Sequence, residues 1–343
     1  MDCEPRAESF RLRLRRQAVK DGVPLTGMLE LTRRCTFRCP HCYAGPALSA
    51  EGELSTAAWK RLLDEAAAAG CLELVLTGGE PLLRADFAEL YVHARRKGLE
   101  VTVFTNASLI DGKAADLFRE WPPFSVEVSV YGLTEPTARV VTGVEDACEA
   151  QWAGVRRLKE AGVPVTLKVL AIRPIRHEIE AIEERARREG LKLRLTTELT
   201  PRLDGDAAPL ALRLDPEDAV ALEAREPGWA ESLKARLASR AGADRHYPCA
   251  AGQYGFFIDA AGWLQPCLAI RALRRNVGEG GLLEAWRAVV QEARGRQLAV
   301  DKKPSDRLLY NCFMCIGLNE WGVGRSFRNW LERVANLRIS RVS

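Results

Sequence analysis

Three cysteines in the first part of the chain have a spacing that suits an iron–sulfur cluster. Cys35, Cys39 and Cys42 form a C-x3-C-x2-C motif within residues 32–43. A cube of four irons and four sulfides has four iron corners, so three thiolates leave one iron open for chemistry. A structural zinc site takes four ligands, usually as two close pairs, and buried thiols are the other alternative. His41, the only neighbouring histidine, lies inside the triplet, so the motif favours a reactive cluster.

A second motif follows the next β-rich run. Thr77 is followed by Gly78, Gly79, Glu80 and Pro81. The two glycines allow a ligand to approach the backbone closely, and Glu80 offers an acceptor for an ammonium group. The same residues also make an ordinary turn, so the motif alone is weak evidence. One strand after the cysteine triplet it gains weight, because the ends of neighbouring parallel strands face the same ligand.

The rest of the chain predicts the elements that must position these motifs. Six β-rich runs, mostly apolar on both faces, lie near residues 28–31, 72–76, 100–104, 126–130, 164–170 and 191–195. Amphipathic helices lie between them, with a cap expected at Ser55 and a capping box at Asp86 and Glu89. Helices are expected to stop at Gly70, Gly98, Gly162 and Gly190. This alternation predicts a parallel α/β sheet, open or curved towards a barrel, with too few units for a complete (β/α)8 barrel.

Length and composition limit the class of protein. A chain of 343 residues suggests about two domains, and a net charge of +4 gives no indication of a nucleic-acid partner. No run of about 18 apolar residues predicts a membrane span, and the N-terminus lacks the apolar core of a secretory signal. Ten cysteines without an export signal favour metal binding or catalysis over disulfides. We therefore expect a cytoplasmic protein with no membrane partner.

With both motifs in place, the chain resembles the radical S-adenosylmethionine (radical SAM) superfamily. Cys35, Cys39 and Cys42 match its signature, followed by the aromatic Tyr43, and the Gly-Gly-Glu-Pro segment matches its second motif. The resemblance covers roughly residues 27–195 and implies a partial (β/α)6 TIM-like barrel. It also implies a [4Fe–4S] cluster whose open iron is chelated by SAM. Reductive cleavage of SAM would then release methionine and a 5′-deoxyadenosyl radical, which takes a hydrogen atom from the substrate.

Polar residues at later strand ends are expected to bind this cofactor. Asn106, just after the third strand, is expected to hydrogen-bond the ribose. Ser129 is expected to bond the ribose or the methionyl carboxylate, and Arg139 to pair with that carboxylate. Lys168 lies on the fifth strand and is expected to point into the barrel. The alternative interpretations are structural, with Asn106 as a turn residue and Arg139 as a solvated helix charge.

A second group of cysteines lies in the last hundred residues. Cys249, the segment from Gly262 to Cys267, and the pair Cys312 and Cys315 offer four thiolates, enough for a cluster or a zinc ion. C-x2-C alone favours zinc, whereas Gly-x4-Cys after an upstream cysteine resembles the SPASM and Twitch extensions of radical SAM enzymes, which carry auxiliary [4Fe–4S] clusters. No cysteine follows Cys315 in this sequence. The resemblance therefore implies one auxiliary [4Fe–4S] cluster, as in the shorter Twitch form.

These patterns divide the chain into four predicted parts. They are an N-terminal extension (1–26), the radical SAM partial barrel (27–197), a linker loop and helix (198–245) and a SPASM/Twitch-like auxiliary domain (246–343). Residues 200–214, rich in Pro, Asp and Gly, are expected to form the loop, and about 216–241 the helix. Cys71 is expected in the core and Cys148 on a helix.

The motifs predict radical chemistry at an unactivated C–H bond, with three alternatives for the role of the chain. The first is modification of a ribosomally made peptide. The residues before 27 are too few for a leader-recognition domain, so a separate peptide-recognition protein is expected. The second is a dehydrogenase of a small molecule such as a sugar or cyclitol. The third is an iron–sulfur electron carrier without turnover, which the Gly-Gly-Glu-Pro motif disfavours, because an electron carrier needs no SAM pocket.

The sequence is less informative about the other participants in the reaction. Reductive cleavage implies a reducing electron donor such as a flavodoxin or a ferredoxin. Lys168 and Glu198 are candidate acid–base groups only through their expected positions near strand ends.

Overall fold

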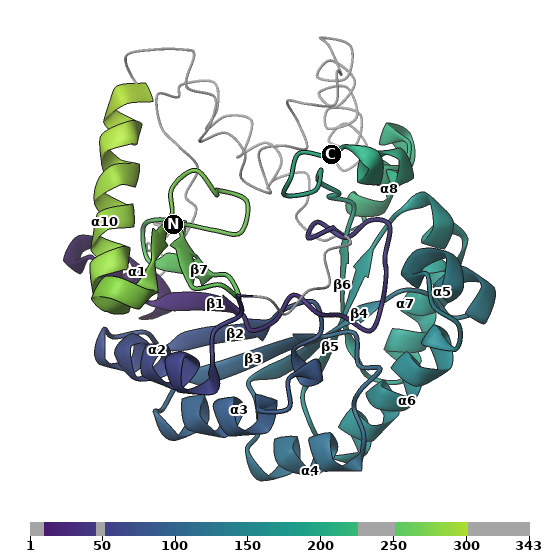
Figure 1. Cartoon of the computed structure of the whole chain (residues 1–343). Coiled ribbons are helices and arrows are strands. Elements are labelled where there is room, and N and C mark those ends of the chain that lie inside the picture. The colour runs from purple at the N-terminus through teal and green to yellow at the C-terminus, as the bar shows by residue number, and fades with distance from the viewer. Residues whose placement is uncertain (1–9, 46–51, 226–250, 301–343) are drawn as a thin grey trace, which may run out of the picture.

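The structure, a computed structural model, describes residues 10–45, 52–225 and 251–300, and its centre is one nine-stranded sheet. The strand order is β6-β5-β4-β3-β2-β1-β7-β8-β9 (Figure 1). The first six strands are all parallel to their neighbours. They are β1 (Thr26–Glu30), β2 (Glu73–Thr77), β3 (Glu100–Thr105), β4 (Ser125–Val130), β5 (Val165–Leu170) and β6 (Lys192–Thr196). Each lies on a predicted β-rich run, so the predicted α/β partial barrel is confirmed.

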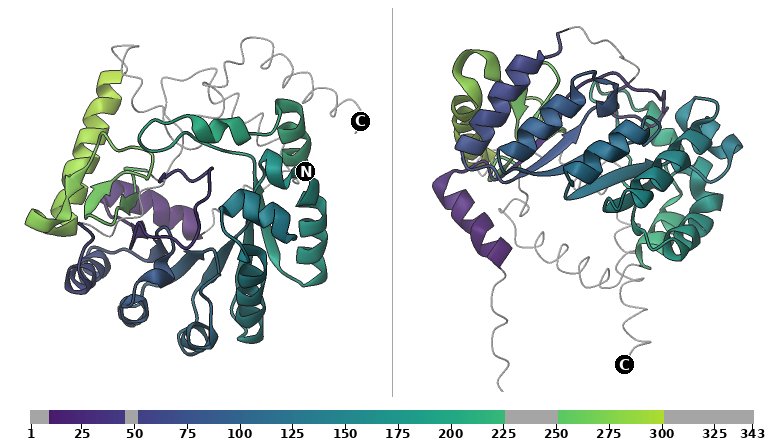
Figure 2. Two further views of the ribbon diagram at one scale, coloured as in Figure 1. Left: turned by 45° about the vertical axis from the view of Figure 1, so that its right-hand side comes forward. Right: turned by 90° about the horizontal axis from the view of Figure 1, so that it is seen from below.

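Helices alternate with these strands and lie along the outer side of the curved sheet (Figures 1 and 2). They are α2 (Thr56–Ala68), α3 (Phe87–Arg96), α4 (Gly112–Glu120), α5 (Glu135–Thr142), α6 (Ala147–Glu160) and α7 (Ile179–Arg188), with short 3-10 turns at Pro81–Leu83 and Arg173–Glu178. A further helix, α1 (Phe10–Asp21), lies near the amino-terminal ends of the strands. Its Arg11 forms ion pairs with Glu73 and Glu100 at 3.9 and 3.8 Å.

Most of the predicted helix boundaries are confirmed. Ser55 Oγ accepts a hydrogen bond from Ala58 N at 3.2 Å at the start of α2. The four predicted stop glycines all have positive φ, from 67° at Gly190 to 91° at Gly70. The predicted capping box at Asp86 is wrong, because its carboxylate accepts hydrogen bonds from Arg84 and Thr56 and caps no amide of α3. Asp86 instead ties the start of α2 to the start of α3.

Alternation along the strands decides which side chains face the helices. Leu74 and Leu76 of β2, and Val101 and Val103 of β3, are at most 1% exposed and belong to the main hydrophobic core. Burying a side chain of this size stabilises the fold by about 1.5–3 kcal/mol. Because successive residues of a strand point to opposite faces, the intervening residues line the inner, concave face of the sheet. That face and the carboxyl ends of the strands are where a site can form.

The strands after residue 250 extend the same sheet. β7 (Gly255–Ile258) is parallel to β1, and β8 (Trp263–Gln265) and β9 (Arg275–Asn276) continue in antiparallel fashion before α10 (Val277–Val300). A Cβ on Gly27 would lie 2.4 Å from the Phe256 ring, so β7 packs closely only because position 27 has no side chain.

Between β6 and β7 the expectations are met in part. The predicted loop 200–214 contains a 3-10 turn, Ala208–Leu212, and α8 (Pro216–Glu223) begins where a helix was expected. It ends at Glu223, and the rest of the predicted span from residue 226 lies outside the described residues. The division into four parts stays a prediction. In the described ranges, every helix is too short or too polar to span a membrane.

Candidate metal and cofactor site

The loop after β1 brings three thiols together at the carboxyl end of the sheet. Cys35, Cys39 and Cys42 are all half-buried free thiols, and Cys42 N donates to Cys39 O at 3.0 Å. Burial, followed by the charges of Cys42 and Cys35, raises the pKa of Cys39. Burial also raises the pKa of the other two thiols. Because iron binds thiolates, loading this site must release protons.

The arrangement of the thiols suits a cluster better than a single ion. Within residues 10–45, 52–225 and 251–300, no three His, Cys, Asp or Glu side chains lie close enough to share one metal ion. A zinc ion requires its donors around one point, whereas in a cubane each cysteine binds a different iron corner. The three neighbouring but separate thiols therefore fit a [4Fe–4S] cluster with one open iron.

The Gly-Gly-Glu-Pro turn holds the cysteine loop through its backbone. Gly79 N donates to Thr32 O and Glu80 N donates to Arg34 O, both at 2.8 Å. A Cβ on Gly78 would lie 2.5 Å from Thr32 O, and one on Gly79 would lie 2.4 Å from Arg34 O. The sequence predicts that these glycines admit a ligand. In the structure, the space left by the two missing side chains is occupied by the backbone of the cysteine loop.

Glu80 connects the ends of β2 and β3. Its fully buried carboxylate accepts hydrogen bonds from Thr105 Oγ1 at 2.8 and 2.9 Å, Asn106 N at 2.8 Å and Leu82 N at 3.2 Å. Burial raises its pKa to about 7, although these hydrogen bonds act in the opposite direction. The carboxylate therefore organises the strand ends around the site, and its predicted contact with an ammonium group stays a prediction.

Asn106 lies against the cysteine loop. Its Nδ2 donates to Thr36 Oγ1 at 2.8 Å and to Cys35 Sγ at 3.8 Å, and its Oδ1 accepts from Ser108 N at 2.9 Å. An amide N–H directed at a ligand sulfur stabilises the thiolate form. The structure thus brings Asn106 to the site, while its predicted bond to a ribose stays a prediction.

Ser129 and Tyr131 place the end of β4 beside the same loop. The Tyr131 ring lies 5.6 Å from the Phe37 ring and 5.7 Å from the His41 ring, measured between centroids. Burial, followed by the charges of Cys39 and Cys35, raises the pKa of the Tyr131 hydroxyl, which also interacts with the Ser129 side chain. Sequence reasoning missed Tyr131, since one tyrosine after a strand has no signal beyond its position.

Two further predicted residues, Tyr43 and Arg139, have different surroundings. Tyr43 follows Cys42, and its carbonyl accepts from Leu203 N at 2.8 Å, which joins the loop to the segment after β6. Burial raises the pKa of the Tyr43 hydroxyl. Arg139 lies on α5 with a largely exposed side chain that pairs with Glu145 at 3.2 Å. Its predicted role with the SAM carboxylate stays a prediction.

The candidate acid–base groups lie on β5 and just after β6. Lys168 of β5 is on the inner face of the sheet, where it forms an ion pair with Glu127 at 3.1 Å. Glu198 is half-buried just after β6, and its backbone N donates to Thr196 Oγ1 at 3.2 Å. The catalytic roles of both residues stay predictions.

A buried charged group that the sequence did not indicate joins the cysteine loop to β7. Glu30, at the end of β1, accepts from Ala260 N at 3.3 Å and forms an ion pair with Arg33 at 3.7 Å. Arg33 also pairs with Asp259 at 3.3 Å. Burial raises the pKa of Glu30. This network fixes the loop against the strands that follow residue 250.

The predicted auxiliary site is described only in part. Cys267, just after β8, is half-buried. Cys249, Cys312 and Cys315 lie outside the described residues, as does Cys3. Cys71 is buried in the core and Cys148 lies on α6, as predicted. The auxiliary [4Fe–4S] cluster therefore stays a prediction.

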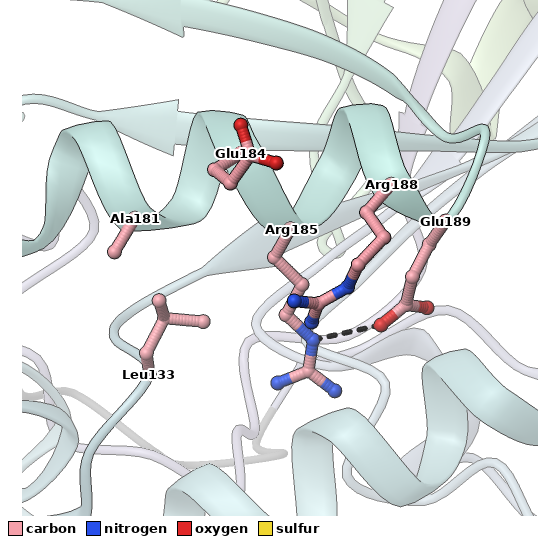
Figure 3. Close-up of a pocket in the computed structure, with 6 residues that line it drawn as sticks. All are labelled: Leu133, Ala181, Glu184, Arg185, Arg188 and Glu189. Carbon is pink, nitrogen blue, oxygen red and sulfur yellow. Dashed lines mark hydrogen bonds and ion pairs between the residues drawn. The ribbon is translucent and has the colours of Figure 1, made fainter.

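One surface pocket lies away from the cysteine loop. It has a volume of about 390 Å3 and is lined by one residue after β4 and five of α7 or its end: Leu133, Ala181, Glu184, Arg185, Arg188 and Glu189 (Figure 3). Arg185 pairs with Glu189 at 2.9 Å and lies over the Trp152 ring at 3.6 Å. Two of the charged residues that line the pocket therefore already pair with each other.

Comparison with known proteins agrees with this fold and site. A sequence model described as the Radical SAM superfamily matches residues 29–197, which include the cysteine loop and the Gly-Gly-Glu-Pro turn. The chain therefore belongs to the radical SAM superfamily, a superfamily of enzymes that use a [4Fe–4S] cluster and SAM.

Two curated relatives and one solved structure indicate how far the similarity extends. Fe-coproporphyrin III synthase of Methanosarcina barkeri is 36% identical over 153 residues, which are 44% of this chain and 38% of that protein. PqqA peptide cyclase of Bradyrhizobium diazoefficiens is 32% identical over 162 residues, 47% of this chain and 43% of that protein. The match thus spans less than half the length of these relatives. Streptococcus suis SuiB bound to S-adenosylmethionine has the same fold, with a TM-score of 0.60, 16% identity, and coverage of 83% of this chain and 71% of SuiB.

Proposed function

We propose that the chain is a radical SAM enzyme that abstracts a hydrogen atom from a peptide substrate. The observation that carries this proposal is the group of three half-buried thiols held by the Gly-Gly-Glu-Pro turn at the carboxyl end of the sheet. When bound, the cluster and SAM would supply reductive cleavage to methionine and a 5′-deoxyadenosyl radical.

The chain's own residues would hold and orient these groups. Cys35, Cys39 and Cys42 would ligate three irons, and Asn106 would stabilise the Cys35 thiolate through its amide N–H. Glu80 would keep the ends of β2 and β3 together beneath the cofactor. Holding the target C–H bond against the radical source supplies most of what a protein contributes to such chemistry, because the cofactor provides the reactive species.

A peptide is the substrate class that we favour. PqqA peptide cyclase is among the similar proteins, and its name describes action on a peptide. Fe-coproporphyrin III synthase, 36% identical over 153 residues, supports the alternative of a small-molecule substrate. A separate peptide-recognition protein and a flavodoxin or ferredoxin as electron donor belong to the same proposal.

The test is SAM cleavage by anaerobically reconstituted full chain with dithionite. We expect 5′-deoxyadenosine from the wild type. Cys35→Ala should lose this activity and should also lose about four irons per chain. Cys148→Ala, which removes a buried thiol of α6, is the matched control and should keep both. A wild type that holds a cubane but makes no 5′-deoxyadenosine would contradict the proposal.

The substrate class needs a second measurement. With a deuterated candidate peptide, deuterium should appear in 5′-deoxyadenosine, because the abstracted atom moves to its C5′ carbon. Transfer from a small molecule, but from none of the peptides, would favour the alternative.

We also propose an auxiliary [4Fe–4S] cluster bound by Cys249, Cys267, Cys312 and Cys315. Cys267→Ala should then lower the iron content by about four per chain while the triplet still binds its cluster. Equimolar zinc and no additional iron in the wild type would show a zinc site instead.

A further inference from the structure

The inner face of β4, β5 and β6 carries a row of three charged side chains. Glu127 of β4, Lys168 of β5 and Arg194 of β6 lie on adjacent parallel strands, and Lys168 stands directly beside Arg194 in the register. The residues that alternate with them, such as Val128 and Leu167, are buried against the helices. The three charges therefore lie on the concave side that the strands enclose, and the chemistry proposed above does not explain them.

One buried carboxylate holds both cations. Glu127 pairs with Lys168 at 3.1 Å and with Arg194 at 3.2 Å. Exposure of the side chains rises along the row, from 9% for Glu127 to 35% for Lys168 and 68% for Arg194. The Glu127 carboxylate is thus desolvated, whereas Lys168 and Arg194 still reach solvent. Within this trio positive charge exceeds negative charge, so an additional anion would be attracted.

The geometry of each cation leaves donors free for such an anion. The Lys168 ammonium lies 3.8 Å from the centre of the Phe104 ring, which fixes it on the face of the sheet. The Arg194 guanidinium has five N–H donors and uses one nitrogen for Glu127. Its exposed donors keep the planar arrangement that binds a carboxylate with two parallel hydrogen bonds. The pair is preorganised, since Glu127 already limits the motion of both side chains.

The row reaches β4, and the residues at the end of β4 contact the cysteine loop. Lys168 is beside Ser129 in the β4–β5 register, and neighbouring strands are about 4.8 Å apart. The Ser129 side chain interacts with the Tyr131 hydroxyl, which lies by Cys39. An anion on Lys168 and Arg194 would therefore hold a substrate close to the cluster without occupying it.

We propose that Lys168 and Arg194 bind a carboxylate of the substrate, so that the proposed enzyme prefers peptides that present a free carboxylate to this site. This inference rests on the proposed function and names its substrate class. It gives Lys168 a role in recognition rather than in proton transfer. The carboxylate comes from a Glu or Asp side chain or from a peptide C-terminus, and the two sources are separated by the choice of probe.

The test measures binding of three blocked amino acids to the cluster-loaded full chain by ligand-observed NMR. N-acetylglutamate amide carries a side-chain carboxylate, N-acetylglutamine a terminal one, and N-acetylglutamine amide neither. We expect one of the two acids to bind at least about tenfold more tightly than the neutral amide, as expected for a hydrogen-bonded charge pair. Arg194→Gln should remove this preference. Arg188→Gln, an exposed arginine on α7, is the matched control and should retain it.

Substitutions of Lys168 provide a second test of the binding site. Lys168→Met should weaken binding of the acid by about tenfold and Lys168→Arg should restore most of it, which separates recognition from loss of folding. Equal binding of all three probes to the wild type would overturn the inference. A fall in the affinity of Arg194→Gln for SAM itself would also overturn it, because the cations would then serve the cofactor. Absence of 5′-deoxyadenosine in the wild type would instead count against the proposed function.

Discussion

At the scale of single residues, the site is organised by buried groups that contact one another more than solvent. Glu80 is fully buried, and its carboxylate accepts hydrogen bonds from Thr105, Asn106 and Leu82, which lie at the end of β3 and in the turn after β2. Asn106 in turn reaches Thr36 and Cys35 in the cysteine loop. A change at Glu80 should therefore act first on protein stability and on the position of Asn106.

The raised pKa of Glu80 predicts a particular pH dependence of stability. Because its pKa rises from 4.5 to about 7 on folding, the folded chain keeps a proton that the unfolded chain loses in this window. The stability that Glu80 contributes is therefore complete below pH 4.5 and is lost as the pH rises to about 7. Relative to Glu80→Gln, the wild type should lose up to about 1.4 kcal/mol per pH unit across this window.

Urea unfolding of the full chain from pH 5 to pH 8 measures this effect. Glu160→Gln, an exposed substitution on α6, is the control and should follow the wild-type profile. Parallel profiles for the wild type and Glu80→Gln would show that Glu80 does not titrate in this range.

At the scale of elements, the cysteine loop depends on its crossing with the turn after β2. The two hydrogen bonds from Gly79 N and Glu80 N are backbone to backbone, so they hold the loop whatever the side chains at Thr32 and Arg34. The absence of a Cβ at both glycines allows this crossing. The turn thus supports the cysteine loop, and its predicted contact with the cofactor stays a prediction.

Gly79→Ala should disturb the cluster more than the fold. Its new Cβ would lie 2.4 Å from Arg34 O, and a backbone atom cannot move aside without moving the loop. We expect at least half of the iron of the triplet to be lost on reconstitution, with a decrease of about 1–3 kcal/mol in stability. Gly112→Ala, which meets open space at the start of α4, is the matched control. Full iron content in Gly79→Ala would show that the crossing is not required.

The elements also show what could be predicted from sequence. The six strands and the stop glycines follow from local patterns, and the structure confirms them. The capping box predicted at Asp86 does not form, because the nearby Arg84 offers its carboxylate a stronger partner than a helix amide. Glu30, Tyr131 and Glu127 gave no signal, since their partners are distant in sequence and only the assembled sheet brings them together.

At the scale of the whole molecule, β7 joins the later residues to the barrel through β1. A Cβ on Gly27 would meet the Phe256 ring at 2.4 Å and the Leu74 side chain of β2 at 2.7 Å. The indole N–H of Trp286 in α10 donates to Gly22 O at 2.7 Å, just before β1. Residues 251–300 therefore stabilise the first strand directly.

The contact at Gly27 predicts an interaction between two substitutions. Gly27→Ala should lower the melting temperature, because its Cβ would lie 2.4 Å from the Phe256 ring, at a cost of about 1–3 kcal/mol. Phe256→Leu opens space there and is itself destabilising. In the Phe256→Leu background Gly27→Ala should cost clearly less, and a double-mutant cycle by thermal unfolding measures the difference. Additive effects of the two substitutions on stability would show that the Phe256 ring does not limit the space at position 27.

The pairing of β1 with β7 also has a consequence for how the protein is made. Arg33 and Asp259 are 226 residues apart in sequence, and the ion pair between them lies at the end of this strand pair. Closing so long a loop is slow in comparison with local βα pairing. As the polypeptide leaves the ribosome, one edge of β1 must stay open until the distant segment is synthesised. Nascent chains would thus pass through an intermediate with an unprotected sheet edge, the kind of species that chaperones bind.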